Sequence, residues 1–147
     1  MSPDPSFSIE KLVLPAGLRT EMQAQAKRLE PQEACGLIGG TIQGEVYYAR
    51  AIFPVTNTLH SAVRYRMEPR EQLAAFEAID AQGWQLVGIY HSHPAGPDQP
   101  SPTDIAEAYY PEAVYLIWFR RAEVWECRAF TIQGGRADSV ALDDFSS

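Results

Sequence analysis

Cysteine, histidine and positive charge are all scarce in this chain of 147 residues. Its two cysteines, Cys35 and Cys127, are too few for a disulfide-rich secreted domain, so we expect buried free thiols in a reducing cytosol. The 12 basic residues are outnumbered by 19 acidic ones, and the net charge is −7. No stripe of lysine and arginine is present, which argues against nucleic acid as the main partner but not against a protein with a basic face.

Long hydrophobic runs are absent as well. No segment approaches the ~18 consecutive apolar residues that a membrane-spanning helix needs. Residues 1–8 are polar and rich in proline, so we expect a flexible N-terminal tail there and not a signal peptide or an anchor. The sequence therefore predicts a cytoplasmic protein without a membrane partner.

The remaining residues, 9–147, have the length and apolar content of a single domain with one core. Hydrophobic periodicity and turn residues predict strands at 9–14, 34–42, 46–55, 62–67, 86–91, 114–119 and 124–132, and helices at 16–30, 69–83 and from 102 to before 111. In the second helix, Leu73, Phe76 and Ile79 are expected to face inward. Because strands and helices mix without a strict βαβ rhythm, we expect an α/β fold with helices packed on a mixed sheet.

The most informative segment is His91-Ser92-His93-Pro94, at the end of a strongly apolar run. Two histidines separated by one residue project from the same face of a strand. Burying two unpaired imidazoles is costly, which favours metal ligation over simple packing. With Asp104 as a third ligand, the site would be one short of a closed tetrahedral zinc site, as in catalytic zinc centres.

Ser101 and Asp104 have a second interpretation. Ser101-Pro102-Thr103-Asp104 is a typical helix start, with serine as the N-cap and an acid in the first turn. The two roles are compatible, since the cap would fix the turn that presents the carboxylate. Beside zinc, Ser101 could also donate a hydrogen bond to an oxyanion.

A zinc hydrolase also needs a general base, and spacing alone does not choose among Glu30, Glu33, Glu68 and Glu71. Glu33 is distinctive because it immediately precedes an apolar, glycine-rich strand. The third histidine, His60, lies in an expected loop, and we predict that it is exposed to solvent.

Three motifs together resemble the JAMM motif of the MPN-domain metalloproteases, above all the small stand-alone prokaryotic members. They are Glu33-x-Cys35-Gly36-Leu37-Ile38-x-Gly40, then His91-Ser92-His93-Pro94, then Ser101-x-x-Asp104. The resemblance implies a cytidine-deaminase-like fold, in which a curved mixed sheet is flanked by helices.

The same resemblance implies a role for each motif residue. His91, His93 and Asp104 would bind one Zn²⁺ per chain, whose bound water would be the nucleophile. Glu33 would be the catalytic acid and base, and Ser101 would stabilise the oxyanion. The Cys35 side chain would serve packing.

The activity implied is a zinc-dependent peptidase or isopeptidase acting after the C-terminal Gly-Gly of a ubiquitin-like sulfur-carrier protein. This prediction includes no nucleic-acid partner and is compatible with a homodimer. Two alternatives remain open at this point. One is a RadC-like protein associated with DNA, which shares the histidine and aspartate block. The other is a non-catalytic MPN scaffold.

Overall fold

The computed structural model describes residues 8–143 of the chain. The tail predicted over residues 1–8 therefore lies outside the described residues, apart from Ser8. No helix among the described residues is long and apolar enough to cross a membrane.

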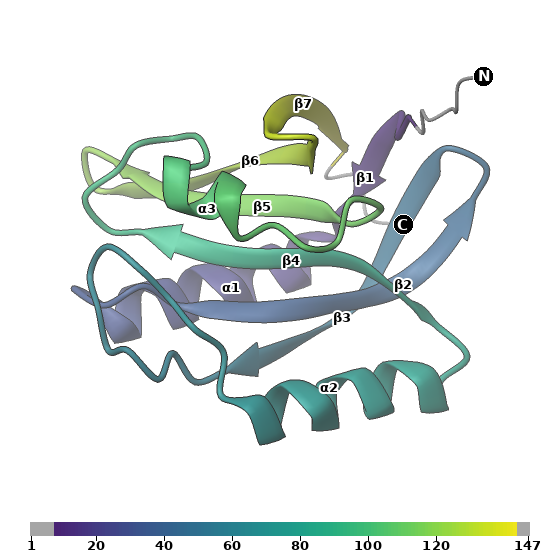
Figure 1. Ribbon diagram of the computed structural model, residues 1–147, viewed down its shortest axis with the longest axis horizontal. Helices are drawn as coiled ribbons and strands as arrows, with labels where there is room; N and C mark the ends of the chain where they lie inside the picture. Colours follow the sequence, from purple (N-terminus) through teal and green to yellow (C-terminus); the bar gives the residue numbers. More distant parts are fainter. Residues whose placement is uncertain (1–7, 144–147) are drawn as a thin grey trace.

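Within residues 8–143, seven strands form one mixed sheet (Figure 1). They are β1 (Lys11–Val13), β2 (Cys35–Gln43), β3 (Val46–Val55), β4 (Gln85–His93), β5 (Val114–Arg121), β6 (Val124–Gln133) and β7 (Arg136–Asp143). Their order is β1-β3-β2-β4-β5-β6-β7, and the sheet closes into a barrel because β1 pairs in parallel with both β3 and β7. β4 and β5 are parallel as well, while the other pairs are antiparallel. The predicted mixed sheet is confirmed, its closure was not foreseen, and the cytidine-deaminase-like relationship stays a prediction.

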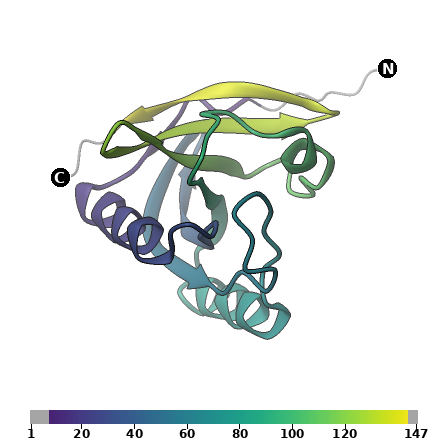
Figure 2. The same ribbon diagram turned by 90° about the vertical axis from the view of Figure 1, so that its left-hand side faces the viewer.

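The helices are α1 (Ala16–Leu29), α2 (Pro69–Ala81) and the short α3 (Pro102–Ala106). α1 buries Met22 and Ala26 in one hydrophobic core, and α2 buries Ala75 and Ile79 in another. Strands β2, β3 and β4 run between the two helices (Figure 2). Consecutive side chains of a strand point to opposite faces, and so Leu37 lies in the core of α2 while Ile38 lies in that of α1.

One predicted strand is wrong. Residues 62–67 form an irregular loop, in which only Met67 makes an isolated bridge, to Asn57. The side chain of Asn57 bonds the carbonyl of Arg64 and the amide of Arg66, and so occupies backbone groups that a strand partner would otherwise bond. We call residues 57–67 the Asn57 loop.

Two further expectations need correction. Leu73 does not face inward, because 59% of its surface is exposed on α2, whereas Ile79 is buried. The last strand, β7, was not predicted, since Val140 is its one buried side chain and the segment carries little hydrophobic pattern.

The anchoring of α1 against the sheet depends on a buried tyrosine. The Tyr90 hydroxyl donates to Gln25 Oε1 over 2.6 Å, and Gln25 Nε2 donates to the Cys35 carbonyl over 3.1 Å. A Cβ atom on Gly36 would collide with the Tyr90 ring. Glycine at this position therefore leaves room on β2 for the ring of Tyr90, its register partner in β4, which directly precedes His91.

Candidate metal centre

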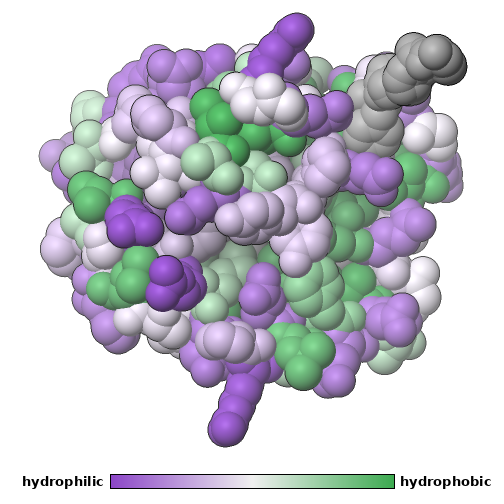
Figure 3. Space-filling model, in the orientation of Figure 1, coloured by the Kyte–Doolittle hydropathy of each residue, from purple (hydrophilic) through white to green (hydrophobic). Residues whose placement is uncertain are grey.

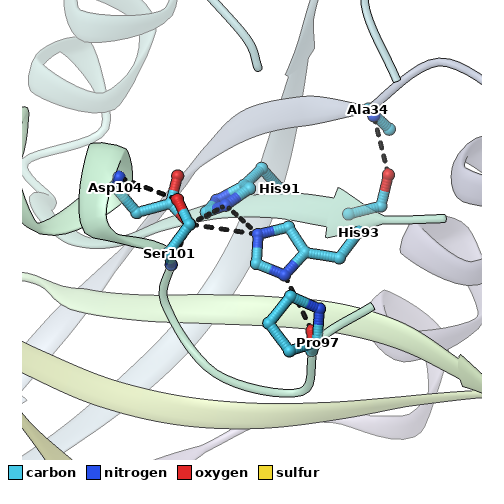
Figure 4. Close-up of polar contacts among 7 residues, drawn as sticks. Ala34, His91, His93, Pro97, Ser101 and Asp104 are labelled. Atoms are coloured by element: carbon cyan, nitrogen blue, oxygen red, sulfur yellow. Dashed lines mark hydrogen bonds and ion pairs between the residues drawn. The ribbon is translucent and has the colours of Figure 1, made fainter. Parts of the chain in front are cut away.

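Three potential ligand atoms form a compact triangle at the end of β4 (Figure 4). His91 Nε2 lies 3.1 Å from His93 Nε2 and 3.1 Å from Asp104 Oδ2, and His93 Nε2 lies 3.0 Å from Asp104 Oδ2. A tetrahedral zinc with bonds of about 2.0–2.1 Å has ligand atoms about 3.3 Å apart. The donor types and their spacing thus fit a zinc ion with one position left for a non-protein ligand.

The strand places both histidines. They lie two residues apart in β4 and point to the same side, as predicted, and both are buried. β4 is paired along its end with β5, through His91 with Ile117 and His93 with Phe119. The two rings therefore project from a strand that is paired with β5 to its end and with β2 as far as His91.

A helix cap places Asp104. The Asp104 amide donates to Ser101 Oγ over 3.0 Å, and the Ser101 amide donates to Asp104 Oδ2 over 2.8 Å, which together make the predicted capping box. Burial would raise the pKa of Asp104, but hydrogen bonds from His91 and His93 outweigh it and hold this pKa well below its usual range. The carboxylate is thus ionised and directed at the histidines, while Ser101 lies beside it as the N-cap (Figure 4).

His93 makes a hydrogen bond through Nδ1, the ring nitrogen that points away from the three ligand atoms. This bond determines which nitrogen of the ring is available to a metal ion. His93 Nδ1 lies 2.8 Å from the Pro97 carbonyl oxygen, which can only accept. Burial would lower the pKa of His93, but the hydrogen bond to Asp104 outweighs it and raises this pKa, so without a metal Nε2 can donate to Asp104. A metal ion at the centre would displace that proton, and His93 would then keep the proton on Nδ1 and offer the lone pair of Nε2 to the metal. Burial lowers the pKa of His91, which keeps this ring neutral and also suited to metal binding.

Glu33 is brought to the same centre from the turn that precedes β2. It is 3% exposed, and its carboxylate forms a cluster with the two histidines in which the ligand atoms lie within 4.8 Å of one another. Either Glu33 or Asp104 could thus be the third ligand beside the two histidines. Asp104 fits better, because its carboxylate oxygen lies closer to the two histidine nitrogens. Glu33 Oε1 has no hydrogen-bond partner among residues 8–143. A buried carboxylate aimed at this centre without a partner is placed as a base would be.

The electrostatics of Glu33 match that placement. Burial raises its pKa to about 8, against the opposing effect of nearby His93. A carboxyl group with a pKa near neutrality can both take up and release a proton. The other three acids that spacing had left open are engaged elsewhere: Glu30 with Arg120 and Trp125, Glu68 as the N-cap of α2, and Glu71 with Thr56.

The backbone around Glu33 is held on both sides. Its amide donates to the Ser61 carbonyl over 2.8 Å, and its carbonyl accepts from Asn57 Nδ2 over 3.1 Å. The next amide, of Ala34, donates to Ser92 Oγ over 2.7 Å (Figure 4). Ser92, between the two histidines, therefore ties Glu33 to the strand that carries them.

Sequence reasoning missed two residues of the Asn57 loop. Asn57 is 4% exposed and makes four hydrogen bonds: its amide nitrogen donates to the carbonyls of Glu33 and Arg64, and its oxygen accepts from the amides of Leu59 and Arg66. Tyr65 stacks on His91. Neither residue belongs to a pattern with a recognisable spacing, and only the folded loop brings them to the site. His60, in the same loop, is exposed as predicted.

A mixed sheet that presents two histidines, an aspartate and an unpaired buried glutamate in one place defines a hydrolase centre able to hold a metal ion. The sequence profile described as "Prokaryotic homologs of the JAB domain" matches residues 15–133, and the chain belongs to this family. It is a JAMM-type hydrolase, which confirms the predicted family and enzyme class and contradicts the scaffold alternative.

Individual relatives agree with this assignment. The chain is 38% identical over 125 residues to the CysO-cysteine peptidase of Mycobacterium tuberculosis, which covers 84% of each chain. It is 39% identical over 88 residues to a desampylase of Haloferax volcanii, covering 59% of this chain and 62% of the relative. The solution structure of protein DSY2949 from Desulfitobacterium hafniense superposes with a TM-score of 0.84 at 33% identity, covering 92% of this chain and 94% of the other.

Proposed function

We propose that this protein is a zinc-dependent peptidase that hydrolyses the amide bond after the C-terminal Gly-Gly of a ubiquitin-like sulfur-carrier protein. The observation that carries the proposal is the triangle of His91, His93 and Asp104 beside the unpaired carboxylate of Glu33. The names of the relatives support the substrate class, since one is a peptidase for CysO-cysteine and another a desampylase.

His91, His93 and Asp104 are the residues that would hold the zinc. When bound, the ion lowers the pKa of a water molecule to about 7 and polarises the substrate carbonyl. Glu33 takes one proton from the attacking water, whose oxygen bonds to the glycine carbonyl carbon. Glu33 then delivers that proton to the amide nitrogen as the C–N bond breaks. The second proton of the water leaves the new carboxyl group and is taken up by the released amine, so the products are the Gly-Gly carboxylate and an ammonium group.

Ser101 and the buried surroundings complete the proposed chemistry. The Ser101 amide hydrogen is occupied by Asp104, but the hydroxyl accepts from the Asp104 amide and keeps its own hydrogen for an oxyanion. His91, His93 and Glu33 are each no more than 3% exposed, and electrostatic interactions are stronger in such a water-poor environment.

The proposal also includes a cytoplasmic setting, a cytidine-deaminase-like fold and no nucleic-acid partner, and a homodimer is compatible with it.

The test is to incubate the zinc-loaded protein with a sulfur-carrier protein that bears one extra residue after Gly-Gly, and to follow its mass. Loss of that one residue is expected for the wild type, and no loss is expected with a chelator or with Glu33→Gln, which keeps the shape of the side chain. An intact substrate with fully zinc-loaded wild type would refute the substrate class. Zinc uptake by Glu33→Gln serves as the control that the metal centre is still formed.

A RadC-like association with DNA is the alternative that the same residues leave. The net charge of −7 disfavours it, because phosphate binding needs clustered cations. Binding to duplex DNA at low and moderate salt tests it directly, and clear salt-dependent binding would favour the alternative.

A further inference from the structure

A pocket of about 400 Å³ opens beside the metal centre, between the Asn57 loop and α3. Its floor is apolar and comes from neighbouring strands of the sheet, through Leu37, Ile89 and Tyr115. Asp104 and Tyr65, which stacks on His91, form part of its wall, so the pocket adjoins the proposed zinc site. A volume of this size suits a small-molecule group, such as one amino-acid residue, and is far too small for a folded protein.

The rim of the pocket carries two arginines, and the two acids that also line it are both engaged, Asp104 with the histidines and Glu107 with Arg64. Arg64 and Arg66 both line it, although the chain as a whole has a net charge of −7. Figure 3 shows this face, on which strongly hydrophilic and hydrophobic groups alternate over short distances. A pocket with an apolar floor and arginines at its rim is complementary to an apolar group that bears a carboxylate.

Arg64 is held at the rim by an exchangeable contact. Its Nη2 lies 3.6 Å from Glu107 Oε2, and the two side chains are 50% and 48% exposed. Ion pairs this exposed contribute little to stability. Glu107 lies three residues after Asp104, about one helical turn further on. The Arg64–Glu107 pair is therefore close to Asp104, the proposed zinc ligand. A carboxylate that enters the pocket can therefore replace Glu107 as the partner of Arg64 at small cost.

The proposed reaction supplies such a carboxylate. When a single amino acid follows Gly-Gly, its nitrogen is in the scissile amide and its own α-carboxylate is only two bonds further along. An isopeptide-linked lysine has no carboxylate so near the scissile nitrogen. We infer that the pocket is the leaving-group subsite and that Arg64 binds the free α-carboxylate of the residue released, which makes the enzyme selective for a single C-terminal residue over an isopeptide. This inference rests on the proposed function.

Two opposite substitutions test it. The substrates are a sulfur-carrier protein ending in Gly-Gly-Leu, either as the free acid or as the C-terminal amide, and the readout is the ratio of their kcat/KM values. We expect Arg64→Met to lower the acid-to-amide ratio about tenfold, the scale of one lost charged hydrogen bond. We expect Glu107→Gln to raise the ratio, because it frees Arg64 from its competing partner.

The pair of variants separates substrate binding from a structural role. If the Arg64–Glu107 contact merely holds the loop to α3, both variants change the ratio in the same direction or leave it unchanged, and the inference is overturned. Arg70→Met is the matched control: it removes the same charge from α2, outside the pocket lining, and should keep the wild-type ratio.

Direct binding distinguishes failure of this inference from failure of the proposed function. Free leucine and leucinamide are titrated into the zinc-loaded protein and followed by thermal shift. Tighter binding of leucine that is lost in Arg64→Met supports the carboxylate subsite even if no Gly-Gly tail is cleaved. Equal binding of the two compounds, or binding insensitive to Arg64→Met, refutes it even if the tail is cleaved.

Discussion

Tyr65 stacks on His91, with ring centroids 4.5 Å apart and planes inclined by 29°. The two histidines of the centre are thus oriented in different ways. His93 is held through Nδ1 by the Pro97 carbonyl, whereas His91 Nδ1 has no hydrogen-bond partner among residues 8–143. Stacking on Tyr65 orients the His91 ring, as the hydrogen bond to the Pro97 carbonyl orients the His93 ring.

We therefore predict that Tyr65→Ala weakens zinc affinity about tenfold, the lower end of what loss of a supporting contact costs a metal site. Tyr65→Phe keeps the ring and should bind zinc as the wild type does. Competition with a chromogenic chelator measures both affinities. Equal losses in the two variants would mean that the hydroxyl, and not the stacked ring, is what matters.

A second prediction concerns Asn57, whose side chain makes four hydrogen bonds to the backbone. Asn57→Ala leaves the buried carbonyl of Glu33 without this donor, and we expect unfolding free energy to fall by about 2–3 kcal/mol. Urea denaturation measures the change. Thr58→Ala is the control in the same loop: it removes one exposed bond, to the Arg66 carbonyl, and should cost under about 1 kcal/mol. Similar losses for the two variants would contradict a central role for Asn57.

The raised pKa of Glu33 predicts how the stability of the metal-free protein depends on pH. Its pKa in the folded state, about 8, lies above its ordinary value of 4.5. The folded state consequently binds more protons between these values, and the unfolding free energy falls as pH rises through this range, by up to about 1.4 kcal/mol per pH unit. Glu33→Gln should remove this decline, so that the variant is more stable than the wild type near pH 8. Urea denaturation in the presence of a chelator at pH 5 and pH 8 checks it, and parallel pH profiles would contradict the assignment.

The contact between Gly36 and Tyr90 gives a prediction about stability. A methyl group at Gly36 would overlap the Tyr90 ring, and we expect Gly36→Ala to destabilise the fold by about 1–3 kcal/mol. Gly17→Ala in α1 is a matched control, because nothing lies within 4 Å of its Cβ position, and there alanine should be neutral or stabilising. Thermal unfolding distinguishes the two, and a Gly36→Ala variant as stable as Gly17→Ala would be incompatible with the described packing.

Much of the site could be predicted from sequence because its residues are local to two elements. His91 and His93 follow from the alternation of a strand, and Asp104 follows them closely in the chain, in a helix start that fixes the turn presenting its carboxylate. Glu33 lies nearly sixty residues away, so spacing alone left it among four acids. Its placement depends on the pairing of β2 with β4, where Cys35 lies opposite His91.

The misread loop has a physical explanation. Val63, Tyr65 and Met67 alternate with arginines, as a half-buried strand would. In the structure Val63 is 72% exposed, Tyr65 covers a histidine, and an asparagine side chain substitutes for part of a strand partner. Side-chain to backbone hydrogen bonds of this kind compete with sheet pairing, and periodicity does not reveal them.

The closure of the sheet has a consequence for how the chain folds. β1 is only three residues long, yet it lies between β3 and β7, with Lys11 paired to both Val46 and Ala141. The last of these contacts joins residues that are far apart in the chain, and loop-closure entropy must be overcome before such contacts give any stability. We therefore expect the ring to close late, after β2 to β6 have paired with their neighbours. Because the histidines and Glu33 lie on β4 and beside β2, the metal centre can assemble while the two ends of the described chain are still apart, and added zinc should accelerate refolding as well as stabilise its product.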